Sequence, residues 1–236
     1  MYGMYGYGYG YGLDPTIILV LIGVALSLWA QGRVNSTFSR YSRVRSMTGM
    51  TGAEAARRLL NAQGIYDVTV QQIAGELTDH YDPRTKTVNL SQSVYGATSV
   101  AAIGVAAHEC GHAMQDNEGY APLRFRSALV PVANFGSSLS WPLILLGLVF
   151  GGLGSPLVEI GILMFSLAVL FQLVTLPVEY NASARAVRLL DSQGILAGEE
   201  VSGTRKVLNA AALTYVAAAA TSILQLLRLI ILFGGR

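Results

Sequence analysis

Four long apolar runs constrain the fold of this chain more than any other feature. They lie at residues 16–31, 129–151, 157–176 and 210–233. A helix needs about 20 apolar residues to cross the hydrocarbon core of a bilayer. Helices and closed barrels are the structures that satisfy their backbone hydrogen bonds there. The runs therefore predict a mostly α-helical membrane protein with about four transmembrane helices.

The spacing of these runs predicts the domain organisation. Transmembrane helix 1 is expected at residues 16–31 and transmembrane helix 4 at residues 210–233. The two middle runs are joined by a short Gly/Pro segment, so residues 127–178 should form a transmembrane hairpin of helices 2 and 3. Residues 1–15 are rich in Tyr and Gly, which predicts a flexible or headgroup-associated N-terminus.

The composition agrees with a membrane protein and excludes several partners. Charged residues make up 13% of the chain, against about 25% in an ordinary soluble domain. The net charge of +2 gives no reason to expect a nucleic-acid partner. No Walker-type phosphate loop occurs, so no use of ATP is predicted. One cysteine excludes an intrachain disulfide.

The basic residues predict the orientation. Fourteen of the sixteen lysines and arginines fall in residues 33–126 and 185–206. An even number of spans separates these two segments, and basic segments stay on the cytoplasmic side. We therefore expect an integral membrane protein, of a bacterial plasma membrane, with both segments in the cytoplasm. Residues 33–125 should form a small cytoplasmic α+β domain, and residues 179–206 a cytoplasmic helix.

Local signals divide the domain into elements. Thr51 and Glu54 form a capping box that opens a helix. Residues 68–73 are typical of a strand, and residues 77–81 and 86–90 of a β-hairpin. The hairpin could offer an edge strand to an extended peptide, or it could merely pack on the next helix.

One short motif in this domain carries chemistry. His108-Glu109-Cys110-Gly111-His112 spells H-E-x-x-H, which places the two histidines on one helix face. Two such imidazoles can hold one Zn²⁺, and Glu109 is placed to act as general base on a zinc-bound water. We expect one Zn²⁺ per chain.

The residues alone leave the third metal ligand open. Cys110 faces away from the two histidines on a helix, and His80 has no motif around it. Glu179 shares a helix face with Ser183, which could hydrogen-bond a ligating group. Asp191 would be the ligand in a protease of the site-2 type, but it follows a polar, charged helix. His80 is also a candidate catalytic residue that polarises the substrate carbonyl, or else a structural histidine that fixes its turn.

A family resemblance favours one of these candidates for the third ligand. From about Arg40 onward, the chain resembles the YugP-type membrane zinc metallopeptidases, distant relatives of the HtpX and CAAX-prenyl-protease gluzincins. The matching stretches are residues 79–83, 88–91, 107–113, 177–183 and 211–215. The resemblance implies a zincin-like domain and Glu179 as the third ligand. The wider group often has Asp where this chain has Ser183.

Together these observations favour a membrane-embedded zinc endopeptidase that cuts flexible or unfolded protein segments near the membrane. Its partners would be protein or peptide substrates, the lipid bilayer, and a membrane protein or a second copy of the chain. Two alternatives remain: a non-catalytic zinc-binding membrane subunit or scaffold, and a site-2-type intramembrane protease. The presence of Glu109 argues against the first, because a scaffold needs no general base.

Overall fold

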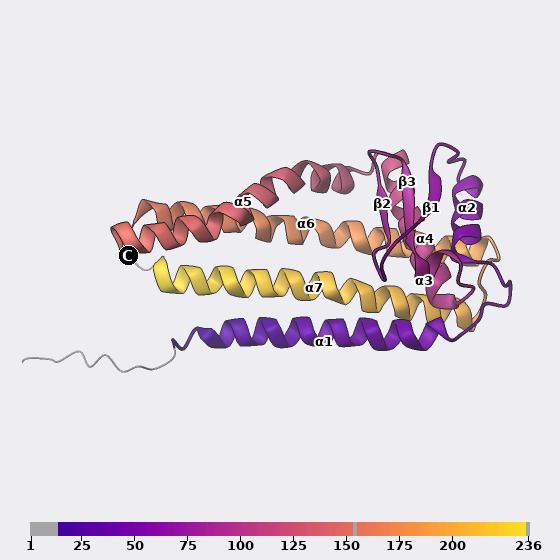
Figure 1. Cartoon of the computed structure of the whole chain (residues 1–236), viewed down its shortest axis with the longest axis horizontal. Coiled ribbons are helices and arrows are strands. Elements are labelled where there is room, and N and C mark those ends of the chain that lie inside the picture. The colour runs from indigo at the N-terminus through magenta and orange to yellow at the C-terminus, as the bar shows by residue number, and fades with distance from the viewer. Residues whose placement is uncertain (1–13, 153–154, 235–236) are drawn as a thin grey trace, which may run out of the picture.

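The computed structural model describes residues 14–152 and 155–234, so most of the Tyr/Gly-rich N-terminus lies outside the described residues. The elements in chain order are α1 (Ile17–Ser42), α2 (Gly52–Ala62), β1 (Thr69–Ile73), β2 (His80–Asp82), β3 (Thr87–Ser91), α3 (Gln92–Tyr95), α4 (Val100–Asn117), α5 (Ala121–Gly151), α6 (Pro156–Ser192) and α7 (Glu199–Phe233). Figure 1 shows four long helices side by side, with the small sheet and the short helices gathered at one end.

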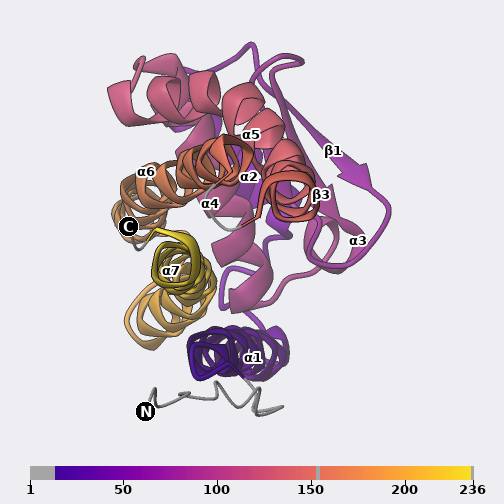
Figure 2. The ribbon, with the colours of Figure 1, turned by 90° about the vertical axis from the view of Figure 1, so that its left-hand side faces the viewer.

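The four long helices confirm the expected membrane architecture. α1, α5, α6 and α7 are each long and apolar enough to cross a bilayer. In the end view of Figure 2, α7 lies between α1 and α6, while α5 packs beside α6. Large apolar side chains point outward from this bundle, among them Leu28, Phe150 and Leu163, which are 70%, 79% and 60% exposed. Such a surface is stable in contact with lipid rather than water.

The helix bounds differ from the expected ones around Pro177. α6 continues through Pro177 and ends at Ser192, and α7 begins at Glu199. The helix expected over residues 179–206 is therefore the end of α6, a turn and the start of α7. Proline removes one backbone hydrogen bond and crowds the preceding turn, but packing against neighbouring helices allows a helix to continue. Pro131 and Pro142 likewise lie inside α5, which bends in Figure 1.

The three strands form a mixed sheet in the order β1-β3-β2. β2 and β3 pair antiparallel, with His80 opposite Asn89, so the predicted hairpin is confirmed. β1 pairs parallel to β3, with Thr69 opposite Thr87, a pairing that the sequence analysis did not anticipate. β3 is buried along its whole length. β2 is left as an edge strand of the sheet.

α4 is the centre of the small domain. It packs against α2, α6, α7 and the sheet, and it carries five Ala and two Gly among its 18 residues. At Gly111 the approach is so close that an added Cβ would lie 2.6 Å from the carbonyl oxygen of Ala182 on α6. Gly111 therefore lets α4 and α6 touch along their backbones at the level of the H-E-x-x-H motif. The capping box at Thr51 and Glu54 is also present and starts α2.

A charged pair marks the other end of the bundle. Arg228 of α7, the single basic residue in the fourth apolar run, contacts the Asp14 carboxylate at 3.3 Å, just before α1 begins. Asp14 thus provides a counter-ion for an arginine within an apolar helix. α1 and α7 consequently run antiparallel, with their uncharged stretches side by side.

Candidate metal centre

Three candidate ligands converge between α4 and α6. His108, His112 and Glu179 each offer one ligand atom, and these atoms lie within 4.8 Å of one another. His108 Nε2 is 3.2 Å from Glu179 Oε2, and His112 Nε2 is 3.5 Å from the same oxygen. The helical spacing of four residues brings the two histidines together, with ring centroids 4.7 Å apart. The close approach at Gly111 brings in Glu179.

These distances fit a zinc ion. Ligand atoms bound tetrahedrally at about 2.0–2.2 Å lie roughly 3.3 Å from one another. The two nitrogen–oxygen distances of 3.2 and 3.5 Å match that separation. Two imidazoles and one carboxylate are also the ligand set of many catalytic zinc sites, which keep a fourth position for water. The residues present therefore fit Zn²⁺ in both chemistry and spacing.

The neighbours of the histidines fix which ring nitrogen faces the ligand cluster. The side-chain amide of Gln115 donates to the Val178 carbonyl oxygen at 2.9 Å and to Asn181 Oδ1 at 3.0 Å. Its Oε1 must therefore accept a hydrogen from His112 Nδ1, 3.0 Å away. That leaves Nε2 of His112 unprotonated and free to bind a metal. Ser183 Oγ, 3.1 Å from His108 Nδ1, can do the same for the other histidine.

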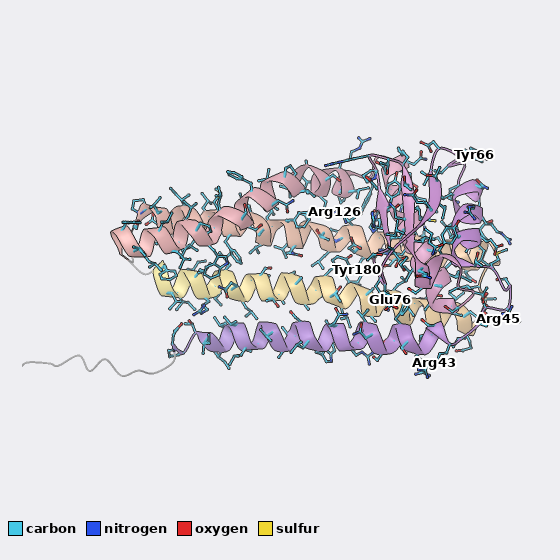
Figure 3. The ribbon with its side chains drawn as sticks, in the orientation of Figure 1. Arg43, Arg45, Tyr66, Glu76, Arg126 and Tyr180 are labelled. Carbon is cyan, nitrogen blue, oxygen red and sulfur yellow. The ribbon has the colours of Figure 1, made fainter. Side chains whose placement is uncertain are left out.

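Arg126 of α5 orients the carboxylate. Its Nη1 donates to Glu179 Oε1 at 2.8 Å, while Oε2 faces the two histidines. Glu179 is almost completely buried, with 2% of its surface exposed. A buried carboxylate is stable only when it is paired, and Arg126 provides this charge partner from a third helix. Figure 3 shows Arg126 beside α6.

Glu109 lies beside the ligands and is also buried, at 7% exposure. Burial raises the pKa of Glu109 to about 7, because removing a carboxylate from water disfavours its charged form. A general base works best when its pKa is near the working pH. The position and environment of Glu109 therefore suit proton transfer at neutral pH.

Two cavities meet at these residues. One, of about 370 Å³, lies towards α5 and the middle of α6, and includes Phe171 in its wall. The other, of about 310 Å³, lies towards α1 and α7, and includes Gln31. His108, Glu109 and Glu179 line both, as do Asp79 and Tyr215. A chain passing from one cavity to the other would therefore cross the ligand cluster.

The remaining sequence candidates lie as follows. His80 lines the first cavity, but its Nδ1 is 2.9 Å from the Thr78 carbonyl oxygen and its Nε2 is 3.2 Å from Asn89 Nδ2. Both of its ring nitrogens are thus engaged, one by the segment before β2 and the other by β3. Cys110 is buried against α2, with its sulfur 3.6 Å from the Ala56 carbonyl oxygen, and burial raises the pKa of its thiol. Asp191 borders a different cavity.

Three residues at the site were given no role by the sequence analysis. Gln115 lies three positions after His112, so helical periodicity alone could have placed it on the ligand face. Tyr215 belongs to a stretch that the family resemblance had matched, although its sequence gave no sign of its role. Arg126 is a basic residue flanking an apolar run, and such residues are usually interfacial.

Comparison with known proteins agrees with this geometry. Residues 16–234 match the family described as "Putative neutral zinc metallopeptidase". The chain belongs to this family. It is also 49% identical over 221 residues to the protein named "Putative membrane protease YugP" of Bacillus subtilis (strain 168), an alignment that covers 93% of this chain and 97% of the relative. No solved structure matches the chain.

Proposed function

We propose that this protein is a zinc-dependent endopeptidase that hydrolyses flexible or unfolded protein segments at the membrane surface. One observation carries the proposal: His108, His112 and Glu179 converge with the buried carboxylate of Glu109 where two cavities meet. The family and the relative in Bacillus subtilis support a zinc peptidase in a membrane.

The chain's own residues divide the work as follows. When bound, Zn²⁺ supplies Lewis acidity, which lowers the pKa of a water at the site to about 7 and polarises the scissile carbonyl. Glu109 takes the proton from the attacking water and returns it to the leaving amine. Arg126 holds Glu179, while Gln115 and Ser183 hold the two histidines in position. Burial of these groups keeps their geometry fixed and strengthens their interactions.

The substrate would bind as an extended chain. β2 is an edge strand, and its residues His80 and Tyr81 line the larger cavity beside Glu109. An edge strand binds an extended peptide through main-chain hydrogen bonds, with little dependence on sequence. Phe171, Gln172 and Thr175 extend the same cavity along α6 into the apolar run of residues 157–176. This arrangement favours protein segments that lie at or just inside the bilayer surface.

A donor to the carbonyl oxygen is needed as negative charge develops there. His80 was the candidate from sequence, but its ring nitrogens are engaged by Thr78 and Asn89, which favours the structural role for that histidine. We propose Tyr215 of α7 as the donor, because it lines both cavities together with Glu109 and Glu179. A phenol hydroxyl is neutral at working pH and can donate without first losing a charge.

Glu109→Gln is the direct test of the endopeptidase mechanism. The substitution removes the base but keeps the size of the side chain and one acceptor oxygen. Hydrolysis of casein by detergent-purified protein should fall by about 10²–10⁴-fold, while zinc content by metal analysis stays near one per chain. Hydrolysis at the wild-type rate by the Gln variant would contradict the proposal.

The same experiment separates an enzyme from a non-catalytic subunit, and the ligand geometry bears on the site-2 alternative. A non-catalytic zinc-binding subunit would show no hydrolysis by wild type or variant, with zinc retained in both. A site-2-type protease would need Asp191 as third ligand, whereas Glu179 lies beside the two histidines. We therefore propose Glu179, as in gluzincins, as the third zinc ligand.

We further propose that the active site faces the cytoplasm. The basic residues of 33–126 and 185–206 and the ligand cluster lie at the same end of the bundle, and basic segments are retained in the cytoplasm. In a Cys110→Ser background, a membrane-impermeant thiol reagent added to intact cells should modify Pro156→Cys and spare Thr85→Cys, two exposed positions. Labelling of Thr85→Cys with protection of Pro156→Cys would reverse the orientation.

A further inference from the structure

A second site lies away from the metal ligands, where α1, α6 and α7 meet. A groove of about 660 Å³ is lined there by Arg33 and Arg40 of α1, Lys206 and Asn209 of α7, and Tyr180 of α6. These lining residues come from three neighbouring helices, and α7 lies between α1 and α6 in the end view of Figure 2. The metal ligands do not line this groove.

The charges in the groove are all of one sign. Three basic side chains line it, and no Asp or Glu does. Within residues 14–152 and 155–234, Arg33, Arg40 and Lys206 form no ion pair and no side-chain hydrogen bond with the protein. The Arg40 guanidinium lies over the Tyr41 ring at 5.6 Å, which restrains its direction. Three cations that line one groove without a counter-ion repel one another, so the groove suits an anionic ligand.

The position of the groove along the bundle identifies the source of that anion. Residues 207–227 of α7 carry no charged side chain, and they separate Lys206 from the Arg228–Asp14 pair. At 1.5 Å per residue, Lys206 and Arg228 are about 33 Å apart along the helix, close to the thickness of a bilayer's hydrocarbon core. Lys206 therefore lies at the level where lipid phosphates begin. Tyr41 of α1 packs against Gly203 of α7, so the neighbouring Arg40 lies close to the same level. Arg33 lies about 10 Å nearer the bilayer centre along α1, from where its long side chain can extend towards the phosphates.

We propose that this groove binds the headgroup phosphate of an anionic phospholipid, in the leaflet nearest the metal centre. Arg33, Arg40 and Lys206 contact the phosphate and any further negative charge of the headgroup. Asn209 adds a neutral hydrogen-bond donor. Tyr180 and Leu213 give the wall an apolar part that the first carbons of the acyl chains can cover. Retention of basic residues in the cytoplasm explains their number on this side. It does not explain why three of them, from two helices far apart in sequence, line one cavity without acidic neighbours.

The lipid site does not depend on peptidase activity, so its test measures binding. Full-length protein in neutral detergent is titrated with phosphatidylglycerol or phosphatidylcholine, and bound lipid is counted by native mass spectrometry. Wild type is compared with the groove variant Arg33→Gln/Arg40→Gln/Lys206→Gln. The matched control is Arg43→Gln/Arg45→Gln/Arg84→Gln, which removes the same charge from exposed positions outside the groove. Figure 3 shows Arg43 and Arg45 at the outer end of the molecule and Tyr180 among the long helices.

The groove variant should bind phosphatidylglycerol at least about tenfold more weakly, since each basic side chain near an anionic headgroup adds several-fold to affinity. The control should stay within about twofold of wild type. Equal losses in the two variants would reduce the effect to general surface charge and overturn the proposal. So would equal binding of phosphatidylcholine, or full displacement of the lipid by millimolar inorganic phosphate, which would indicate a site for a free anion.

Folding of the variants is checked independently through their zinc content and unfolding temperature. If the triple variant does not fold, Arg33→Gln/Lys206→Gln takes its place in the same titration. The charge-conserving variant Arg33→Lys/Arg40→Lys should retain lipid binding within about threefold. Loss of binding in this conservative variant together with wild-type binding in the glutamine variant would contradict a charge-based site.

Discussion

α4 and α1 are both apolar helices, yet they have opposite surroundings. Of the 18 residues of α4, 14 are buried, and most of these are small. Of the 26 residues of α1, only Gly23 and Ala30 are buried, and large side chains such as Leu28 and Trp29 point outward. The difference shows that average hydropathy does not distinguish a helix surrounded by protein from one surrounded by lipid.

The size of the apolar side chains makes that distinction. Small residues let neighbouring backbones come close, as Gly111 does against Ala182. Close backbones bring ligands on two helices to within bonding distance of one ion. Large apolar residues instead cover the surface in contact with lipid. The candidate metal centre is therefore built around α4, while α1 contributes a cavity wall and α7 contributes a cavity wall that includes Tyr215.

The largest effect should come from removing the ligand that α6 brings to α4. Glu179→Ala removes one of three ligand atoms and leaves Arg126 without its carboxylate partner. Metal analysis of purified protein should show zinc lost, and casein hydrolysis should fall by at least about 10³-fold.

Asp191→Ala and Cys110→Ala are the controls for this change. Both should keep zinc near one per chain, since neither side chain lies in the ligand cluster. If Asp191→Ala lost the metal while Glu179→Ala kept it, the site-2 arrangement would replace the one proposed here.

A smaller effect should show which region donates to the carbonyl oxygen. Tyr215→Phe removes a single hydroxyl from the bundle helix α7 and should lower kcat by about 10²–10³-fold. His80→Gln, in the sheet, should lower kcat by less than about tenfold. Zinc content should be unchanged in both variants. A larger loss of kcat for His80→Gln than for Tyr215→Phe would assign the donor to the sheet instead.

The smallest effect concerns the packing that distinguishes the two helices. Gly111→Ala places a Cβ against the backbone of α6 and should lower the free energy of unfolding by about 1–3 kcal/mol. Gly32→Ala on α1 meets nothing within 4 Å and should be neutral or stabilise by up to about 1 kcal/mol. Thermal unfolding in detergent measures both. Equal destabilisation by the two substitutions would contradict the idea that α4 needs a small residue at its contact with α6 whereas α1 does not at Gly32.

Local patterns in the sequence predicted several features that the structure confirms. The apolar runs predicted four long helices, and a capping box predicted the start of α2. Residues 77–81 and 86–90 predicted the β2–β3 hairpin. Each of these depends on residues close together in the chain. The parallel pairing of β1 with β3 and the continuation of α6 through Pro177 depend on distant contacts, and neither was predicted.

The residues of the candidate site fall into the same two groups, those predicted from local sequence and those brought together by distant contacts. The sequence by itself determined that His108, Glu109 and His112 share one turn of helix, because helical periodicity fixes the relative positions of residues four apart. Spacing alone left the third ligand open, and Glu179 was implied by the family resemblance. Only the tertiary structure decided that Glu179 meets the histidines, that Arg126 holds Glu179, and that three cations share one groove. These contacts join different helices, and they depend on how closely the helices pack, which local pattern does not specify.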